Sequence, residues 1–254
     1  MISINELKYY TSLTIKKFRD SEKKFLVEGE KIVTEGLNSS HKCEIIFVTN
    51  DFRETRKDFL AGLKDRINRI EVLKNKEFNK ISDTVSPQGI AGVFLKKHSK
   101  NFIEEPIHEK LVVYLDEISD PGNLGTIIRN CDWFGIKRLL ISKNSADYLN
   151  PKSIRASMGS VFHINIYDNV FPQEIFPELK LKGFKILCAD LEGLNVFDYR
   201  IDTKSVLIFS NESAGPSTDL LNFIDNKITI PRRGSAESLN VAGASAVILS
   251  QLTN

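Results

Sequence analysis

Several residue types are scarce in this chain of 254 residues, and each scarcity excludes a class of protein. The three cysteines, Cys43, Cys131 and Cys188, are odd in number and widely spaced, which argues against a disulfide framework and a thiolate metal site. The four histidines show neither an i, i+4 pair nor a cysteine neighbour, so no zinc site is expected. We predict buried or neutral thiols and no bound metal.

Long apolar runs and targeting signals are missing as well. No stretch approaches the roughly 18 apolar residues that a membrane span needs. The first residues, MISINE, lack the basic and apolar regions of a signal peptide. No Gly-x-Gly-x-x-Gly follows an apolar run, which excludes a dinucleotide-dependent oxidoreductase. We therefore expect a cytoplasmic protein that does not enter a membrane.

The residues that are present give an ordinary composition with an uneven distribution of charge. A hydrophobic content of 41% and a charged content of 27% suffice for one large or two modest domains. Residues 1–100 hold 20 Lys and Arg against 14 Asp and Glu, whereas the remainder holds 15 against 19. A basic module suits a polyphosphate backbone, because each neutralised phosphate releases condensed counterions. Lysine-rich, solvated helix faces are the alternative interpretation.

Apolar runs of strand length divide the chain into two α/β regions. A capping-box pattern at residues 3–6 predicts a helix, with apolar residues at helical intervals up to Phe18. Four runs then predict the strands of a small α/β sandwich: 25–27, 43–49, 69–73 and 90–95. Residues 96–109 lack apolar periodicity and are interpreted as a linker, which gives domains of 1–105 and 106–254. Five nearly continuous apolar runs predict a parallel sheet covered on both faces: 111–115, 138–142, 184–189, 206–209 and 227–230.

Three polar segments of the second region each follow one of these strands. They are 123–129 (NLGTIIR), 211–216 (NESAGP) and 230–240 (IPRRGSAESLN). Strand ends of open α/β sheets are the usual place for ligand sites, so we expect these segments to gather around one ligand. Taken singly, each segment also has a structural explanation: a surface arginine at 129, a polar turn at 211–212 and a helix cap at Asn240.

The same segments resemble the three motifs of the SpoU branch of the SPOUT RNA methyltransferases, also called the TrmH family. The matching residues are Asn123 and Arg129 in motif one, Asn211 and Glu212 in motif two, and Ser238, Leu239 and Asn240 in motif three. Upstream, residues 16–19 (KKFR) and 25–31 (FLVEGEK) resemble the start of the small RNA-binding domain of many members. The resemblance thus covers most of the chain.

The resemblance implies a fold and an activity. The fold would be a SPOUT-type parallel-sheet catalytic domain with a C-terminal trefoil knot, preceded by a small, ribosomal-protein-like α/β sandwich that binds RNA. The activity would be methyl transfer from S-adenosylmethionine to a ribose 2′-hydroxyl of structured RNA, with ribosomal RNA as the expected substrate, by a homodimer formed through the C-terminal domain. A non-catalytic RNA-binding protein that retains the fold and a transfer-RNA 2′-O-methyltransferase remain as alternatives.

The resemblance also implies roles for individual residues. The implied catalytic residues are Arg129, Asn123, Glu212, Ser238 and Asn240. The implied donor-binding residues are Ala189, Ser210, Asn211, Glu212, Gly215, Ile230 and Leu239. The implied RNA contacts are Lys16, Lys17 and Arg19, with Arg155 as a secondary candidate.

Two of these positions raise chemical questions. A guanidinium stays protonated up to a pKa of about 12 and has no lone pair in that state, so we do not expect Arg129 to accept the hydroxyl proton. We expect it to bind the adjacent phosphate and stabilise the developing alkoxide, with the proton passing to water or a neighbouring group.

Motif two departs from the family, since Ser210, Ser213 and Pro216 replace two glycines and an aliphatic residue. The added Cβ atoms would restrict backbone approach to the donor.

Overall fold

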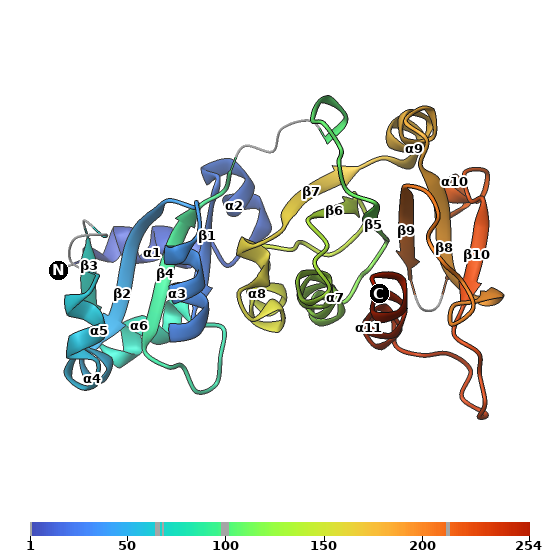
Figure 1. Ribbon diagram of the computed structural model, residues 1–254. Helices are drawn as coiled ribbons and strands as arrows, with labels where there is room; N and C mark the ends of the chain where they lie inside the picture. Colours follow the sequence, from blue (N-terminus) through green and yellow to red (C-terminus); the bar gives the residue numbers. More distant parts are fainter. Residues whose placement is uncertain (1, 64–66, 68, 98–101, 212–213) are drawn as a thin grey trace. The chain divides into compact units, whose positions relative to one another are not determined.

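The structure is a computed structural model that describes residues 2–63, 67, 69–97, 102–211 and 214–254. The chain divides into two compact units (Figure 1). The N-terminal unit comprises the described residues of 1–98 together with Asp147–Phe162. The C-terminal unit comprises the described residues of 99–146 and 163–254. Among the described residues, no helix combines the length and the apolar character that crossing a bilayer requires.

The N-terminal unit contains a mixed four-stranded sheet in the order β1-β4-β2-β3. Its strands are β1 (Lys24–Glu28), β2 (Cys43–Thr49), β3 (Ile70–Leu73) and β4 (Ile90–Leu95). Strand β4 is antiparallel to β1 and β2, and β2 is parallel to β3. All four strands predicted for this region are therefore confirmed.

Helices α1 (Ile4–Ser12) and α6 (Asn75–Ile81) share a hydrophobic core with this sheet, in which Leu7 and Phe78 pack with Phe47. The predicted capping box between Ser3 and Glu6 is present at the start of α1. The helix ends at Ser12, however, and a separate helix, α2 (Lys16–Glu22), follows. The continuous helix up to Phe18 that the apolar spacing suggested is therefore wrong.

The remaining helices of the N-terminal unit include a segment from far along the sequence. Helices α3 (Glu30–Asn38), α4 (Asn50–Thr55) and α5 (Lys57–Ala61) follow β1 and β2. Helices α8 (Pro151–Ser157) and η2 (Ser160–Phe162) lie between two strands of the other unit in sequence, yet pack here. The Phe162 ring contacts the rings of Phe25 and Phe94, at centroid distances of 6.0 and 5.3 Å. We call Asp147–Phe162 the returning segment.

The C-terminal unit contains a six-stranded sheet in the order β10-β8-β9-β5-β6-β7, and every strand pair is parallel. Its strands are β5 (Leu111–Asp116), β6 (Arg138–Ser142), β7 (Asn165–Val170), β8 (Lys185–Asn195), β9 (Ser205–Ser210) and β10 (Asn226–Thr229). The predicted parallel sheet and its five predicted strands are confirmed, and β7 is an additional edge strand.

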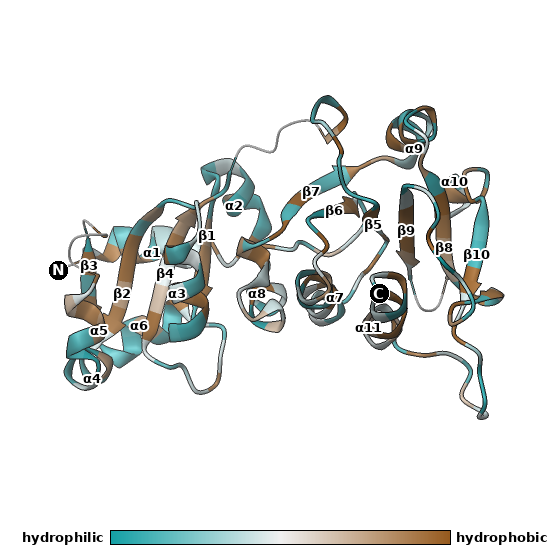
Figure 2. Ribbon diagram, in the orientation of Figure 1, coloured by the Kyte–Doolittle hydropathy of each residue, from teal (hydrophilic) through white to brown (hydrophobic). Residues whose placement is uncertain are grey.

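Helices cover both faces of this sheet (Figure 1). Helices α9 (Pro172–Leu181) and α10 (Thr218–Leu221) lie on one face, and α7 (Pro121–Trp133) and α11 (Val241–Leu252) lie on the other. Tyr114 and Ile208 pack against Phe176 of α9, whereas the alternate residues of each strand point to the opposite face. Burial on both faces explains why β5 and β9 are almost uniformly hydrophobic in Figure 2.

Part of the predicted linker also belongs to this unit. The short 3₁₀ helix η1 (Phe102–Glu104) begins with Phe102, which is buried in the core of the C-terminal unit together with Ile107. Arg138 extends this contact, because its guanidinium donates to Glu109 at 2.9 Å and lies over the Phe102 ring. Residues 102–109 are therefore packed into the C-terminal unit and do not form a free linker.

Candidate active site

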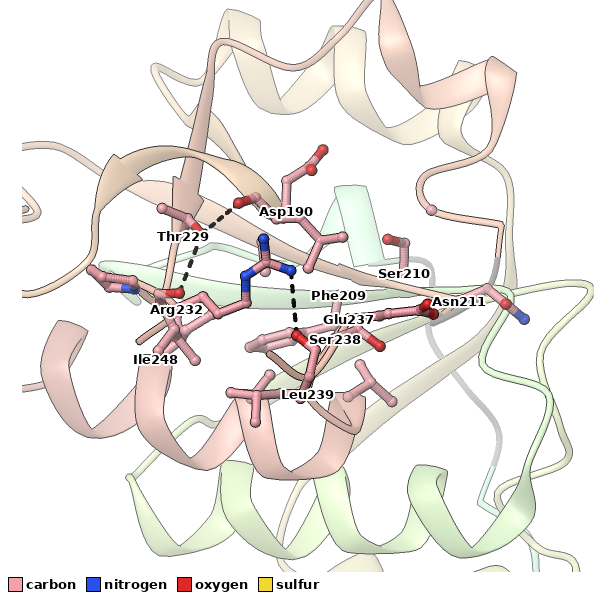
Figure 3. A pocket seen from close by; sticks show the side chains of 18 of the residues that line it. Asp190, Phe209, Ser210, Asn211, Thr229, Arg232, Glu237, Ser238, Leu239 and Ile248 are labelled. Atoms are coloured by element: carbon pink, nitrogen blue, oxygen red, sulfur yellow. Dashed lines mark hydrogen bonds between the residues drawn. The ribbon is translucent and has the colours of Figure 1, made fainter. Parts of the chain in front are cut away.

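The carboxyl edge of the parallel sheet contains a pocket beside the point where the strand order reverses. Strand β5 has β6 on one side and β9 on the other, and ligand sites of open α/β sheets lie at such points. The pocket has a volume of about 470 Å³, is formed by β8, β9, β10, the loop that follows β10, and α11, and is shown in Figure 3. This volume lies within the range of small-molecule sites, roughly 300 to 1,000 Å³.

The pocket has an apolar floor and a polar rim (Figure 3). Phe209, Leu239 and Ile248 supply apolar surface, and of these Phe209 and Ile248 are buried. Asp190 and Arg232 supply opposite charges at the rim. Such a combination can hold a flat apolar ring system that carries charged substituents.

The loop after β9 is held by hydrogen bonds of Asn211. The Asn211 side chain donates to the carbonyl oxygen of Glu117 at 3.2 Å and accepts from the N–H of Ala214 at 3.2 Å. The N–H of Gly215 donates to the carbonyl oxygen of Asn211 at 3.0 Å. Gly215 has a φ of +68°, a conformation that glycine adopts without strain. Asn211 therefore ties the loop to the end of β5.

A buried carboxylate holds the far end of the same loop. Asp116, the last residue of β5, is 1% exposed and accepts hydrogen bonds from the N–H and hydroxyl of Ser217, at 2.8 and 3.2 Å. Burial raises the pKa of Asp116 because it disfavours the charged carboxylate, although the Ser217 donors oppose this effect. The loop is thus fastened to β5 at both ends.

Side-chain amides join the two helices beside the pocket. Asn240 caps α11 by accepting from the N–H groups of Ala242 and Gly243, and its amide donates to Asn123 of α7 at 3.0 Å. The Asn130 amide of α7 donates to the carbonyl oxygen of Ala242 and to the Ser245 hydroxyl, both at 2.9 Å. Motif one and motif three are therefore linked directly.

Arg129 lies on a different side of α7. Asn123 and Asn130 are seven residues apart, about two turns, and both face α11, whereas Arg129 is rotated from Asn130 by about 100°. Arg129 is exposed and is not among the residues that line the pocket. Within the described part of the chain, its guanidinium makes no hydrogen bond or ion pair. The described protomer therefore presents Arg129 to solvent and not to its own pocket.

A family model described as the SpoU rRNA Methylase family matches residues 110–250, which is more than half of the chain. The chain belongs to the SpoU rRNA methylase family. A second family model, the MRM3-like substrate binding domain, matches residues 5–92. The two matches follow one another along the chain and are separated by residues 93–109; the first contains most of the N-terminal strands and the second contains the whole parallel sheet.

Individual relatives and solved structures agree with this membership. The chain is 33% identical over 248 residues to the Bacillus subtilis 23S rRNA (guanosine(2553)-2'-O)-methyltransferase RlmP, which covers 97% of this chain and 95% of that protein. An AdoMet-bound rRNA methyltransferase from Sinorhizobium meliloti has a TM-score of 0.85 and 28% identity, with 99% and 95% of the two chains covered. The AdoMet complex of the SpoU methyltransferase AviRb from Streptomyces viridochromogenes shares the fold, with a TM-score of 0.89, 24% identity, and 99% and 97% coverage.

Most of the residues that the SpoU resemblance implied lie at or beside the pocket. The residues that line it are Ala189, Ser210, Asn211, Gly215, Ile230, Leu239 and Ser238. Asn123 and Asn240 meet beside it, Arg129 lies apart, and Glu212 is outside the described residues. The roles assigned to these residues stay predictions.

In the altered motif two, the backbone conformation of Ser210 does not require a glycine. Ser210 is the last residue of β9 and pairs with Asp116, and it is not among the described residues with a positive φ. Serine therefore meets no backbone strain at this position. Ser213 lies outside the described residues, and Pro216 lines the pocket.

Four charged residues that line the pocket were not predicted as site residues: Asp190, Arg232, Arg233 and Glu237. Arg232 points into the pocket in Figure 3, and its guanidinium donates to the carbonyl oxygen of Ala236 at 3.3 Å. Asp190 is partly buried, which opposes ionisation, but hydrogen bonds from Lys227, at 2.7 Å, and from backbone N–H groups lower its pKa overall. Asp190 directly follows the predicted strand 184–189, so the strand-end rule that found the three motifs also applies to it.

The predicted RNA contacts in the N-terminal unit divide into two groups. Lys16 and Lys17 are exposed on α2. Arg19 is 2% exposed, and its guanidinium donates to the Asp147 carboxylate and to the carbonyl oxygens of Leu13 and Thr14. An enclosed guanidinium cannot reach an RNA phosphate, so the prediction for Arg19 is corrected to a structural role.

Arg155 of α8 is also engaged within the N-terminal unit. Its guanidinium forms an ion pair with Asp83 at 3.0 Å, and its side chain is 31% exposed. The neighbouring Nη1 atom is buried and has no hydrogen-bond partner among the described residues. Arg155 therefore offers less free surface to RNA than Lys16 and Lys17 do.

Proposed function

We propose that this protein transfers the methyl group of S-adenosylmethionine to a ribose 2′-hydroxyl of large-subunit ribosomal RNA. The observation that carries the proposal is a single pocket that gathers residues of motifs two and three at the carboxyl edge of the parallel sheet. The Bacillus subtilis relative, which bears the name of such an enzyme, matches over 97% of the chain. This coverage supports a shared reaction type.

The pocket fits the methyl donor in size and chemistry. Its apolar floor suits an adenine ring, and the ionised Asp190 at the rim suits a cationic ligand. A Cβ atom added at Gly215 would meet nothing within 4 Å, so the backbone there is open to a ligand. When bound, S-adenosylmethionine supplies a methyl group activated by a sulfonium. We further propose that the loops after β9 and β10 belong to the trefoil knot expected of the family.

The residues of the chain would position the acceptor. The 2′-hydroxyl must lose its proton and lie in line with the methyl carbon at near-attack distance. Arg129 would bind the neighbouring phosphate through its guanidinium and stabilise the developing alkoxide. Ser238 at the pocket rim would orient the hydroxyl. The amide pair of Asn123 and Asn240 would hold the helices that carry these groups.

We propose that two copies associate through the exposed side of α7. Trp133, four residues after Arg129 on that side, is 82% exposed, which is unusual for an aromatic residue of its size. Association there would cover Trp133 and bring Arg129 close to the pocket of the second copy. Because Trp133 is the only tryptophan in the chain, dilution of a dimer should shift its fluorescence to longer wavelength. An emission spectrum that is independent of concentration, from a protein that sediments as a monomer, would contradict the dimer.

The cytoplasm is the proposed location. The three cysteines are unpaired, and burial raises the pKa of each thiol. Unpaired thiols are typical of a reducing compartment, which is also where ribosomal RNA is found. The proposed substrate and the unpaired cysteines therefore both support a cytoplasmic location.

Ribosomal RNA from a strain that lacks the gene provides the test of the activity. The purified protein and isotopically labelled S-adenosylmethionine are expected to methylate one ribose of the large-subunit RNA, which mass spectrometry of RNA fragments would locate. Calorimetry should show donor binding by the protein alone. Absence of donor binding at millimolar concentration would instead support a non-catalytic RNA-binding protein, and transfer to tRNA alone would refute the ribosomal substrate.

A further inference from the structure

The N-terminal unit contains a second cleft that the catalytic pocket does not involve. Its volume is about 610 Å³, and it lies between α4, α6 and the residues that precede β4. The polar groups that line it include Arg56, Asn75, Asn79 and Gln88. The catalytic proposal assigns no task to any of them.

Two side-chain amides face this cleft from α6. Asn75 and Asn79 are four residues apart, so they lie one above the other on the same side of the helix. Both residues are exposed, and neither amide makes a hydrogen bond to another described residue. Each amide presents one acceptor oxygen and two donor hydrogens to a ligand.

The opposite side of the cleft is fixed by contacts of Glu30. The N–H of Glu30 donates to Oε1 of Gln88 at 3.0 Å, which leaves the amide nitrogen of Gln88 as a donor. The Glu30 carboxylate accepts from Nε of Arg56 at 2.9 Å. A Cβ atom at Gly89, where φ is +81°, would lie 2.4 Å from the Thr49 hydroxyl oxygen. The backbone of this wall is thus closely packed at Gly89, and contacts with Glu30 hold the exposed side chains of Gln88 and Arg56.

The chemistry of the cleft favours a nucleobase over a phosphate. Lysine is absent from the described residues that line it, and its single arginine, Arg56, is already paired with Glu30, while Asp51 adds negative charge. Paired amides match the mixed donors and acceptors of a base edge. Lys76 and Lys80, each one residue after an asparagine, form an adjacent exposed stripe on α6, where a phosphate backbone could bind.

We propose that this cleft binds one unstacked nucleobase of the RNA substrate and reads its edge through Asn75, Asn79 and Gln88. Lys76 and Lys80 hold the flanking backbone. Sequence-specific RNA recognition generally uses such splayed, single-stranded bases. The inference rests on the proposed function only in taking RNA as the ligand.

Binding of short single-stranded RNA oligomers, each of one base type, to the full chain tests the proposal by fluorescence anisotropy. The wild-type protein should prefer one base by about 10-fold, the discrimination expected of one good bidentate pair. The double variant Asn75→Ala/Asn79→Ala should lose this preference and bind every oligomer as weakly as an abasic one. Its thermal unfolding should match the wild type, since both asparagines are exposed.

A matched control uses the same helix. The variant Lys76→Gln/Lys80→Gln should weaken all oligomers alike and reduce the salt dependence by roughly one to two phosphate contacts, while the base preference persists. Gln88→Glu, which replaces donors with a carboxylate, should change the preferred base and provides a second variant if the double variant unfolds.

The outcomes separate this proposal from the catalytic one. A wild type without base preference, or a folded double variant that keeps it, would overturn the cleft assignment even if methyl transfer is normal. An amide-dependent base preference in a protein that neither binds S-adenosylmethionine nor transfers methyl groups would uphold the cleft and refute the activity. In an active enzyme, the double variant should raise KM for RNA and leave kcat and donor affinity unchanged.

Discussion

Among single residues, Arg129 can be tested directly by measuring turnover of a conservative variant. Arg129→Lys keeps the positive charge but removes the planar pair of donors that a phosphate or alkoxide can accept from. Loss of one preorganised donor typically lowers kcat by about 100-fold or more, so we expect a fall of about 100-fold under single-turnover conditions. Donor affinity measured by calorimetry without RNA should change little, because the proposed ligand of Arg129 is a phosphate of the RNA and not the methyl donor.

Arg53→Lys is the matched control for this substitution. Arg53 is exposed, lies in the other unit and pairs only with the adjacent Glu54 among the described residues. Its replacement should leave turnover unchanged. Nearly full turnover by Arg129→Lys would show that the reaction needs charge alone at this position.

His41 should make the stability of the N-terminal unit depend on pH. Burial, together with the smaller effect of the positive charge of Lys97, lowers the pKa of His41 from 6.5 to about 4. The folded state therefore binds fewer protons than the unfolded state between these values. His41 costs no stability above pH 6.5, and stability falls as the pH drops toward 4. Between pH 7 and pH 5 we expect a loss of about 2 kcal/mol from this residue, measured by urea unfolding.

His41→Phe should remove the part of the pH dependence of stability that comes from His41. The ring of His41 packs edge-on against Phe25 and Phe162, so another aromatic ring can occupy the site. A variant whose unfolding free energy falls between pH 7 and pH 5 as steeply as that of the wild type would show that other groups cause the dependence.

Among the elements, α7 and α11 act as a pair because of Asn240. Asn240→Ala removes the N-cap of α11 and the bond to Asn123, so the free energy of unfolding should fall by about 1 kcal/mol. Asn240→Asp keeps the cap, and the Asn123 amide can rotate to donate to the new carboxylate. This variant should therefore remain close to the wild type in denaturant unfolding. Equal destabilisation by both variants would mean that the cap contributes little.

The strands show how much of the fold the sequence predicts. Runs such as 43–49, 90–95 and 138–142 coincide with β2, β4 and β6, because a strand buried on both faces must be apolar throughout. The edge strand β7, Asn165–Val170, mixes Asn and Asp with apolar residues because only its middle is buried, so its pattern was not recognised. In the two described sheets, local apolarity thus reveals the central strands and also the edge strands β1, β3 and β10, and it misses β7, whose apolar residues are interrupted by Asn and Asp.

For the candidate site, the position of a residue after a predicted strand is a better guide to its location than its residue type is. Residues that follow the ends of parallel strands lie on one edge of the sheet, which is why Ser210, Ile230 and Leu239 could be expected to share a pocket. Arg19 could not be placed in this way. Its partner, Asp147, is 128 residues away in sequence, and nothing near Arg19 distinguishes a buried guanidinium from a surface one.

At the scale of the whole molecule, the stability of the N-terminal unit depends on the returning segment, which lies far from it in sequence. Asp147→Asn would leave the buried Arg19 guanidinium without a counter-charge, so the N-terminal unit should lose about 3 kcal/mol of unfolding free energy. Asp20→Asn, an exposed position, should change it by less than about 0.5 kcal/mol. Equal denaturation midpoints for the two variants would contradict the structural role assigned to Arg19.

A fragment of residues 1–105 should be unstable for the same reason. It would lack Asp147 and Phe162, which complete the packing around Arg19, Phe25 and Phe94. We expect circular dichroism to show a lower melting temperature than that of the same unit in the full chain. A fragment as stable as the intact unit would show that the returning segment adds no stability.

The returning segment also determines how the protein should respond to a protease. A single cut between Lys97 and Phe102 severs the backbone at the predicted linker, but α8 and η2 remain part of the larger fragment while packed on the smaller one. The two pieces should therefore elute together in gel filtration and separate only in denaturant. Two separately expressed fragments, residues 1–97 and 98–254, should likewise associate when mixed. The returning segment of the larger fragment would hold them together noncovalently by packing on the smaller one.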